Sequence, residues 1–331
     1  LTALIGGVFL IFVGIALARP LLELMGTPDN VIDQSVLYMR IYFVGMPSFM
    51  LYNFGSAILR AIGDTKRPLY FLTLAGVINV FLNLFFVIVF HMGVAGVALA
   101  TIISQTVSAI LVLLCLMKME GPCHLDFKHL KFHLNQLGQM LRIGLPAGLQ
   151  SVMYSLSNLV IQSSINRFGT DMMATWTAYG KLDSFFWMII SAFGVTITTF
   201  VGQNFGAHKY DRMRKSIRTC LVMATVATLL VTGLLLTFGE TLYRLFTDEE
   251  VVIQKGMQVL RLLAPFYCTY IGVEVFAGTV RGAGDSLIPM LMTLFGVCVL
   301  RVVWIYTVFA HYKTITSLFL LYPVSWIITG I

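Results

Sequence analysis

The sequence predicts an all-α polytopic membrane protein, a helical bundle built from two pseudo-symmetric lobes. Three observations support this prediction: the composition, a series of long apolar segments and an internal repeat. Hydrophobic residues make up 58% of the 331 residues and charged residues only 11%, with a mean hydropathy of +0.87. Because a soluble domain carries about 25% charged residues, this chain lacks the polar side chains needed to cover a surface in water.

The chain contains ten apolar segments, each near or above the ~20 residues that a helix needs to cross a bilayer. They cover residues 1–25, 32–62, 68–90, 94–117, 139–166, 172–201, 216–239, 251–280, 288–310 and 314–331. Pro20 closes the first segment and Pro47 lies inside the second. Proline is tolerated in membrane bundles and marks a kink there.

The charges between the segments alternate along the chain. The connections around 60–67, 118–142, 202–218 and 281–287 hold thirteen of the 22 Lys and Arg residues, and the alternate connections hold five. The positive-inside rule places the basic connections in the cytoplasm. The distribution of the charges behind the net +7 therefore indicates the topology in the plasma membrane, and we expect a lipid bilayer and no nucleic acid as partner.

A repeat divides the chain. Residues 60–68 match residues 281–289, with Arg, Gly, Asp and Pro in register at an offset of 221 residues, and Arg40 and Arg261 keep that offset. We expect Arg and Asp to end a helix at the membrane face, Gly to allow the turn and Pro to begin the next helix. The residues assigned this structural role are Arg60, Asp64, Arg281, Gly284 and Asp285. Six spans per copy would place both copies in the same orientation, as a parallel repeat.

The repeat also predicts the domains. Residues 1–118 form a partial N-terminal lobe with spans three to six, residues 119–138 a cytoplasmic linker, and residues 139–331 a C-terminal lobe with spans seven to twelve. The partners of spans 139–166 and 172–201 would precede residue 1, and the last span stops at residue 331. We therefore expect an incomplete N-terminal lobe and a truncated last helix.

The linker has two features of its own. The linker is predicted to form a short amphipathic helix at the cytoplasmic surface. Its apolar residues are Leu130, Phe132, Leu134 and Leu137. Potential metal ligands are Cys123, His124, His129 and His133. Two histidines four residues apart can share a metal, but the ligand set is not closed, so we favour a solvated cationic segment and expect no metal and no cofactor.

Three motifs carry a resemblance to a known family. They are Leu145–Gln150, the run Gly202-Gln203-Asn204-Phe205-Gly206-Ala207, and Val280–Asp285. In this order and spacing they resemble the multidrug and toxic compound extrusion family. The resemblance implies two six-helix lobes, alternating access, and efflux of organic, often cationic, drugs driven by a proton or sodium gradient. The first two spans of that family are absent, and span 139–166 carries no acid, so the resemblance leaves the coupling ion open.

Two acids inside the spans are candidates for ion coupling, because ionisable groups in a membrane are costly to bury. Asp183 lies near the middle of its span, on one helix face with Trp176, Tyr179 and Trp187. An acid among aromatic rings suits an organic cation or a proton. The alternative interpretation is an internal ion pair with Lys181 or Arg301.

Glu274 is the only acid in the eighth span, two turns before Arg281. It is our first choice for ion coupling. The alternative is a structural salt bridge, again to Lys181 or Arg301, which would be costly to break.

Further residues are expected to line a substrate cavity. Lys181 could replace the ion when the site is empty. Gln150, Asn158 and Gln162 form roughly one polar stripe on span 139–166, where they would face a cavity or join helices by hydrogen bonds. The substrate side of the prediction thus comprises Trp176, Tyr179, Lys181, Trp187, Gln150 and Asn158.

We predict an antiporter for small organic molecules, acting as a monomer. The alternative is a flippase for a lipid-linked anionic oligosaccharide, because Arg40, Lys181, Arg261 and Arg301 outnumber the acids inside the spans. An enzyme is not expected, since the sequence contains no nucleophile–His–acid set, metal dyad or phosphate-binding loop.

Overall fold

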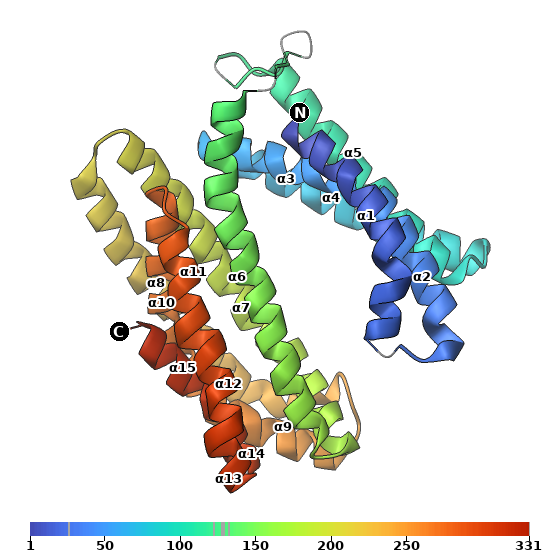
Figure 1. Cartoon of the computed structure of the whole chain (residues 1–331), viewed down its shortest axis with the longest axis vertical. Helices are drawn as coiled ribbons and strands as arrows, with labels where there is room; N and C mark the ends of the chain where they lie inside the picture. Colours follow the sequence, from blue (N-terminus) through green and yellow to red (C-terminus); the bar gives the residue numbers. More distant parts are fainter. Residues whose placement is uncertain (26, 122, 127–129, 132, 331) are drawn as a thin grey trace. The chain divides into compact units, whose positions relative to one another are not determined.

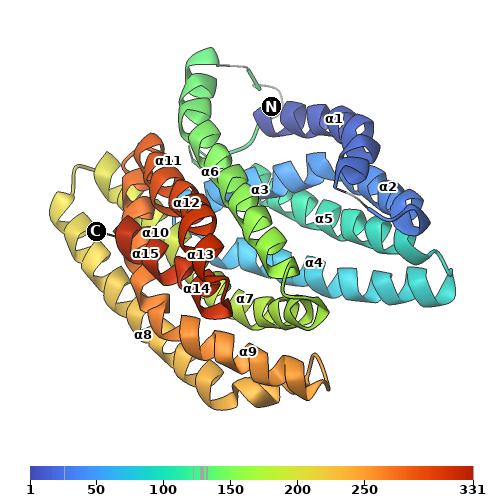
Figure 2. The ribbon, with the colours of Figure 1, turned by 60° about the horizontal axis from the view of Figure 1, so that its bottom comes forward.

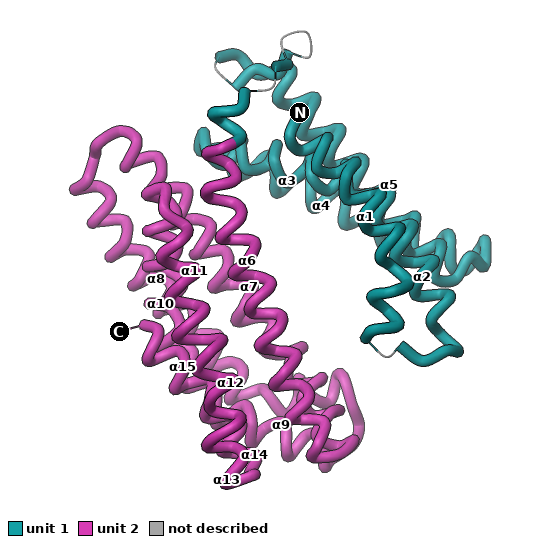
Figure 3. Tube along the Cα trace, in the orientation of Figure 1, with its two compact units in different colours: residues 1–137 teal, residues 138–331 magenta. Residues whose placement is uncertain are grey.

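The computed structural model describes residues 1–25, 27–121, 123–126, 130–131 and 133–330, and this part of the chain contains helices and connections but no strand (Figure 1). The chain divides into two compact units, Leu1–Leu137 and Gly138–Ile331 (Figure 3). The fold is all-helical, as the composition predicts.

Among the described residues that precede α6, the first unit contains five α-helices and one π-helical turn. They are α1 (Thr2–Leu24), α2 (Asp29–Val44), α3 (Met46–Ala61), α4 (Lys66–Leu84), the π-helical turn Phe85–Val89 and α5 (Gly93–Lys118). Helix α5 packs against α2, α3 and α4, and α1 packs against α2 and α3. The buried cluster between α3 and α5 is small and aliphatic apart from Tyr52.

The second unit begins with three long helices, α6 (Leu134–Asn166), α7 (Thr170–Gly206) and α8 (Tyr210–Arg244). Helix α9 (Glu250–Leu263) and α10 (Tyr267–Gly282) follow, joined by a 3₁₀ turn over Ala264–Phe266. Helix α7 packs against α8, α9 and α10, and α8 also lies against α9 (Figure 2). This makes α7 the helix around which the other elements of the unit are arranged.

The end of the second unit is a series of shorter pieces. They are α11 (Leu287–Thr293), a π-helical segment (Leu294–Val299), α12 (Leu300–Trp304), a π-helical turn (Ile305–Phe309), α13 (Ala310–Tyr312), α14 (Ile315–Phe319) and α15 (Leu321–Gly330). Helix α15 is in contact with both α10 and α12.

The sequence repeat is visible in the helix bounds. Helices α3 and α10 are both 16 residues long, and α10 begins 221 residues after α3. Each follows a break, at Gly45 in the first unit and at Ala264–Phe266 in the second. Pro47 and Pro265 explain the breaks, because proline lacks the N–H that would continue the helical hydrogen bonding.

The repeated motif forms the same turn twice. Gly63 has φ 92° and Gly284 has φ 97°, a conformation that glycine adopts at little cost. The N–H of Asp64 donates to Leu59 O at 2.9 Å, and that of Asp285 to Val280 O at 3.1 Å, which is the Schellman pattern of helix termination. Each aspartate side chain then accepts a backbone N–H of the next helix, from Arg67 at 3.1 Å and from Leu287 at 2.8 Å.

Seven helical stretches of the described residues are long and apolar enough to cross a membrane. The other three predicted spans differ for physical reasons. Segment 32–62 is divided into α2 and α3 by the break at Gly45, and segment 314–331 forms the short helices α14 and α15. Segment 139–166 lies within α6, which is 33 residues long but carries many Gln, Asn and Ser residues.

The predicted surface helix in the linker is wrong as stated. Leu134 and Leu137 belong to the first turn of α6, where Leu137 N donates to His133 O at 3.0 Å, and Leu130 is not helical. A short separate helix is marginally stable, whereas extending α6 gains one hydrogen bond per added residue. Phe132 and His129 lie outside the described residues. No group of three metal-ligating side chains occurs among the residues that are described.

Candidate functional site

A cavity of about 510 Å³ lies inside the second unit, and residues of α6, α7, α9, α10, α12 and α15 line it. Six of its lining residues are Trp176, Tyr179, Asp183, Trp187, Tyr270 and Glu274. A slightly larger groove of about 580 Å³ runs along α7 and α8, but no carboxyl group lines it. We therefore take the cavity with both acids as the candidate site.

Asp183 is held by three neutral hydrogen-bond donors. Tyr267 Oη donates to Oδ1 at 2.6 Å, Trp187 Nε1 donates to Oδ2 at 2.7 Å, and Tyr179 Oη lies 3.2 Å from Oδ1. No Lys or Arg of the described residues lies within ion-pair distance of this carboxyl group. The predicted alternative, a pair with Lys181 or Arg301, is therefore wrong.

Stacked aromatic rings set the position of these donors. The Tyr267 ring stacks on Phe186 with centroids 4.1 Å apart, and the Tyr179 ring stacks on Trp176 at 5.0 Å. The two tyrosine hydroxyls are 2.9 Å apart. Because rings packed in this way have little rotational freedom, the hydroxyl groups are fixed toward Asp183 before any ligand binds.

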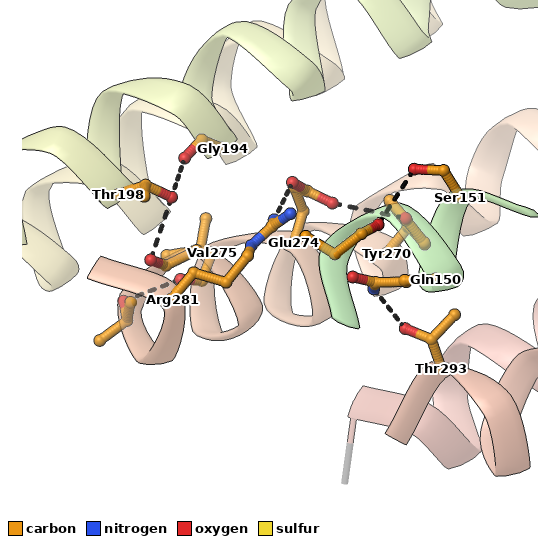
Figure 4. Close-up of polar contacts among 12 residues, drawn as sticks. Gln150, Ser151, Gly194, Thr198, Tyr270, Glu274, Val275, Arg281 and Thr293 are labelled. Carbon is orange, nitrogen blue, oxygen red and sulfur yellow. Dashed lines mark hydrogen bonds and ion pairs between the residues drawn. The ribbon is translucent and has the colours of Figure 1, made fainter. Parts of the chain in front are cut away.

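Glu274 forms an ion pair within its own helix. Arg281 Nη2 lies 2.9 Å from Glu274 Oε1, and the side chains are 25% and 20% exposed, respectively (Figure 4). Seven residues are about two helical turns, so both side chains leave the same face of α10. The predicted partners Lys181 and Arg301 are therefore wrong. Tyr270 Oη is a weaker neighbour, 3.5 Å from Glu274 Oε2.

Small residues bring α7 close to α10 beside Glu274. A Cβ atom added at Gly194 would overlap Glu274 Oε1, and one added at Gly278 would meet Gly194 O at 3.0 Å. Thr198 Oγ1 shares its proton between Gly194 O of its own helix at 2.8 Å and Gly278 O of α10 at 3.0 Å, and Figure 4 shows the first of these contacts. Small residues permit such close packing of membrane helices, so Glu274 lies directly against the α7 backbone.

The polar stripe on α6 divides between two roles. Asn158 and Gln162 line the cavity. Gln150 does not: it is buried and donates to Thr293 Oγ1 of α11 at 2.7 Å (Figure 4). Its amide therefore joins two helices, which was the alternative interpretation of the stripe.

Lys181 does not line the cavity. It is exposed and forms no ion pair among the described residues. Two residues turn an α-helix by about 200°, so Lys181 leaves α7 on nearly the opposite side from Asp183. A lysine replacing the ion at this site is not supported by this geometry.

Arg301 was not among the residues predicted to line the cavity, but the structure places it there. It lies in α12, is 2% exposed, and lines the cavity. Its Nε donates to Ser325 Oγ at 3.1 Å, and its guanidinium lies 4.4 Å from the centroid of the Tyr322 ring. Arg40 and Arg261 are exposed instead. One feature of the sequence could have identified Arg301 as a cavity residue: it is the only Lys or Arg in the apolar segment 288–310.

The Gly202–Ala207 motif forms the end of α7, which extends past the predicted limit at residue 201. Gly202, Gln203, Asn204 and Gly206 lie in its last turns. Asn204 is buried and donates Nδ2 to Phe200 O at 2.8 Å. The turn that follows contains His208 at φ 56°, and the N–H of Lys209 donates to Asn204 O at 2.8 Å. The motif thus terminates a helix and takes no part in the cavity.

Comparison with known proteins places these features in context. The protein-family model described as MatE matches residues 1–85 and 146–307. The chain is 28% identical over 88% of its length to the probable multidrug resistance protein YoeA of Bacillus subtilis (strain 168). It is 32% identical over 87% of its length to the probable multidrug resistance protein YpnP of the same strain. It spans 64% of the length of each of these relatives.

The fold is also similar to solved structures. One is a MOP superfamily transporter from Pyrococcus furiosus Vc1, with a TM-score of 0.92 and 21% sequence identity. The similarity covers 99% of this chain and 74% of that chain. The helical arrangement described above is therefore that of a known membrane fold.

Proposed function

The chain belongs to the MatE family of multi-pass membrane transporters, and on that premise we propose that the protein exports organic, often cationic, molecules in exchange for protons or sodium ions. The observation that carries the proposal is the cavity, which brings Asp183 and Glu274 together among aromatic rings. The relatives YoeA and YpnP are probable multidrug resistance proteins, and this similarity supports a drug-like substrate. We further propose a monomer in the plasma membrane with residues 119–138 in the cytoplasm.

The cavity is suited to a bulky organic cation. Trp187 donates its ring N–H to the carboxyl group of Asp183, and Trp176 lines the same cavity, so a cation gains energy from both the charge and the rings. A volume of about 510 Å³ lies in the usual range for drug-sized ligands. Asp183 is thus proposed as the group that a cationic substrate and a coupling ion both compete for.

Glu274 is proposed as the second ion-coupling residue. A proton or sodium ion that binds its carboxylate weakens the attraction to Arg281, which lies 2.9 Å away. Arg281 stands next to the turn that ends α10, so release of the pair acts where this helix meets its connection. The ion can bias the conformational equilibrium only by binding one state more tightly than the other.

The flippase alternative requires a cationic cavity, and the geometry does not favour it. Of the four intramembrane bases that suggested it, only Arg301 lines the cavity, together with two acids. Lys181, Arg40 and Arg261 are all exposed. We therefore retain the exporter as the proposal.

The proposal is tested with the full-length gene product in proteoliposomes, by following a fluorescent dye cation under an imposed proton or sodium gradient. Wild-type protein should move the dye under one of the two gradients. Glu274→Gln should lose at least about tenfold of the gradient-driven rate, because the amide cannot bind a proton or hold the ion pair with Arg281. Movement of the dye under neither gradient would overturn the exporter, and a Glu274→Gln variant with full gradient-driven efflux would exclude that residue from coupling.

A further inference from the structure

Arg301 carries a buried charge that the proposed coupling scheme does not use. Its only hydrogen bond among the described residues is from Nε to Ser325 Oγ, at 3.1 Å. Ser325 in turn donates to Tyr322 O at 2.8 Å, so the serine is held as the acceptor. A guanidinium has five N–H groups, and those on the two terminal nitrogens therefore have no acceptor within the described part of the chain.

No acid among the residues that the structure describes neutralises this guanidinium. Within the described residues, no carboxylate lies within 4.0 Å of it, although Asp183 and Glu274 line the same cavity. Glu274 is paired with Arg281 and Asp183 with three neutral donors. Burying an arginine without a counter-ion is costly, so the position calls for an anion that arrives from outside the chain.

The surroundings orient Arg301 for such an anion. The Tyr322 ring lies 4.4 Å from the guanidinium carbon, and stacking of this kind leaves the edge of the guanidinium free. The fork of N–H groups on that edge matches a carboxylate, with which it forms two parallel hydrogen bonds. Trp326 and Tyr270 line the same cavity and can pack against the aromatic body of a ligand.

We propose that Arg301 binds the carboxylate of an amphoteric aromatic substrate, whose cationic group lies toward Asp183 in the same cavity. This inference rests on the proposed function and narrows its substrate class from cations to molecules that carry both charges. A carboxylate adds two charge-assisted hydrogen bonds at Arg301 that a purely cationic molecule cannot form.

Rhodamine 110 and rhodamine 123 test the inference, because they share one fluorescent cationic ring system and differ only in a free carboxylate against its methyl ester. Binding of each dye to purified full-length protein is measured by fluorescence polarisation without any gradient. Wild-type protein should prefer rhodamine 110. Arg301→Gln should weaken rhodamine 110 binding about tenfold or more and should strengthen rhodamine 123 binding, because a repelling positive charge has been removed.

The opposite signs separate a binding role from a structural one. A folded Arg301→Gln variant that weakens both dyes in parallel, or that changes the binding of neither, would overturn the inference. Arg261→Gln is the matched control, since Arg261 is exposed on α9 and does not line the cavity. It should leave the ratio of the two affinities as in wild type.

If Arg301→Gln does not fold, Arg301→Lys and the wild-type preference decide the matter. Lysine keeps the charge but not the fork, so rhodamine 110 binding should weaken severalfold while its preference over rhodamine 123 decreases. A wild-type preference for rhodamine 123 would contradict the inference. Because binding is measured without a gradient, this result is independent of whether either dye is exported.

Discussion

Helices α3 and α10 are the same element of the repeat, and they differ in one charge. Both have 16 residues, follow a proline-associated break and end in the same glycine turn. Glu274 of α10 corresponds to Asn53 of α3, an exposed residue whose Nδ2 donates to Phe49 O at 2.8 Å. Arg281 accordingly has an acid partner, whereas Arg60 forms no ion pair among the described residues. The two helices therefore share their length and their terminal turn, but only α10 carries an acid that pairs with the arginine.

The cores of the two units differ in the same sense. The buried cluster of the first unit contains Tyr52 and four aliphatic residues. The cluster of the second unit includes Tyr179, Phe186 and Tyr267, whose stacked rings hold the donors to Asp183. The repeat thus supplies the scaffold, while aromatic residues of the second unit stabilise an acid inside it.

Removing the arginine of each copy should give the largest contrast. Arg281→Gln leaves Glu274 as a partly buried, unpaired charge, so we expect a loss of about 2–3 kcal/mol, between the values for surface and buried pairs. Arg60→Gln should cost less than about 1 kcal/mol, because no ion pair is lost. Thermal unfolding in lipid nanodiscs measures both. Equal losses would show that the ion pair with Glu274 does not make Arg281 contribute more to stability than Arg60.

A methyl group added to α7 beside Glu274 should disturb the ion pair that Glu274 forms with Arg281 in α10. Gly194→Ala would force the carboxylate away from Arg281, at a cost of about 1–2 kcal/mol from overpacking. Gly180→Ala, on the same helix with open space around it, should be neutral or stabilising by about 0.5–1 kcal/mol. In a double-mutant cycle Gly194→Ala and Arg281→Gln should be non-additive. Additive costs would mean that Gly194 does not act through the ion pair.

The shared turn should respond alike in both copies. Gly63→Ala and Gly284→Ala place a side chain at φ 92° and 97°, and each should cost about 1 kcal/mol. Neither Cβ would meet another atom within 4 Å, so backbone strain alone should set the cost. Unfolding free energies that differ clearly between the two variants would break the structural equivalence of the copies.

The smallest effect is expected at a pair of charges that the repeat has exchanged. Arg19 pairs with Glu23 in α1 at 3.0 Å, and at the corresponding positions of α8 Glu240 pairs with Arg244 at 3.0 Å. All four side chains are more than 40% exposed. Arg19→Gln and Arg244→Gln should therefore each lower the thermal unfolding temperature only slightly, less than any substitution above. A larger loss of stability for Arg244→Gln would indicate that its second contact, to Glu250 at 2.7 Å, contributes to the stability of the fold.

Much of the fold could be predicted because its signals are local. Apolar length, proline and the Arg–Gly–Asp spacing each act within a few residues, so the helix bounds around Gly63 and Gly284 agree with the repeat. The linker helix failed because Leu134 and Leu137 are equally compatible with a separate helix and with an extension of α6. For the site, helical periodicity predicted Trp176, Tyr179, Asp183 and Trp187 on one helix face, and all four line the same cavity.

The partners of the charged residues could not be predicted in this way. Sequence spacing alone offered Lys181 and Arg301 as counter-ions, but it is packing between helices that chooses a partner. The stacking of Tyr267 against Phe186 directs its hydroxyl to Asp183. The glycines between α7 and α10 place Glu274 against a backbone that leaves it facing Arg281.

The amino-acid sequence by itself determined that this chain is a helical membrane protein with a duplicated unit and two acids inside its later spans. Composition and short-range periodicity are sufficient for that, because the bilayer requires every span to satisfy its own backbone hydrogen bonds. Only the tertiary structure decided which charges meet. Arg301 is buried without an acid partner, whereas Glu274 is paired with Arg281, and both outcomes depend on residues that lie more than twenty positions away or on another helix.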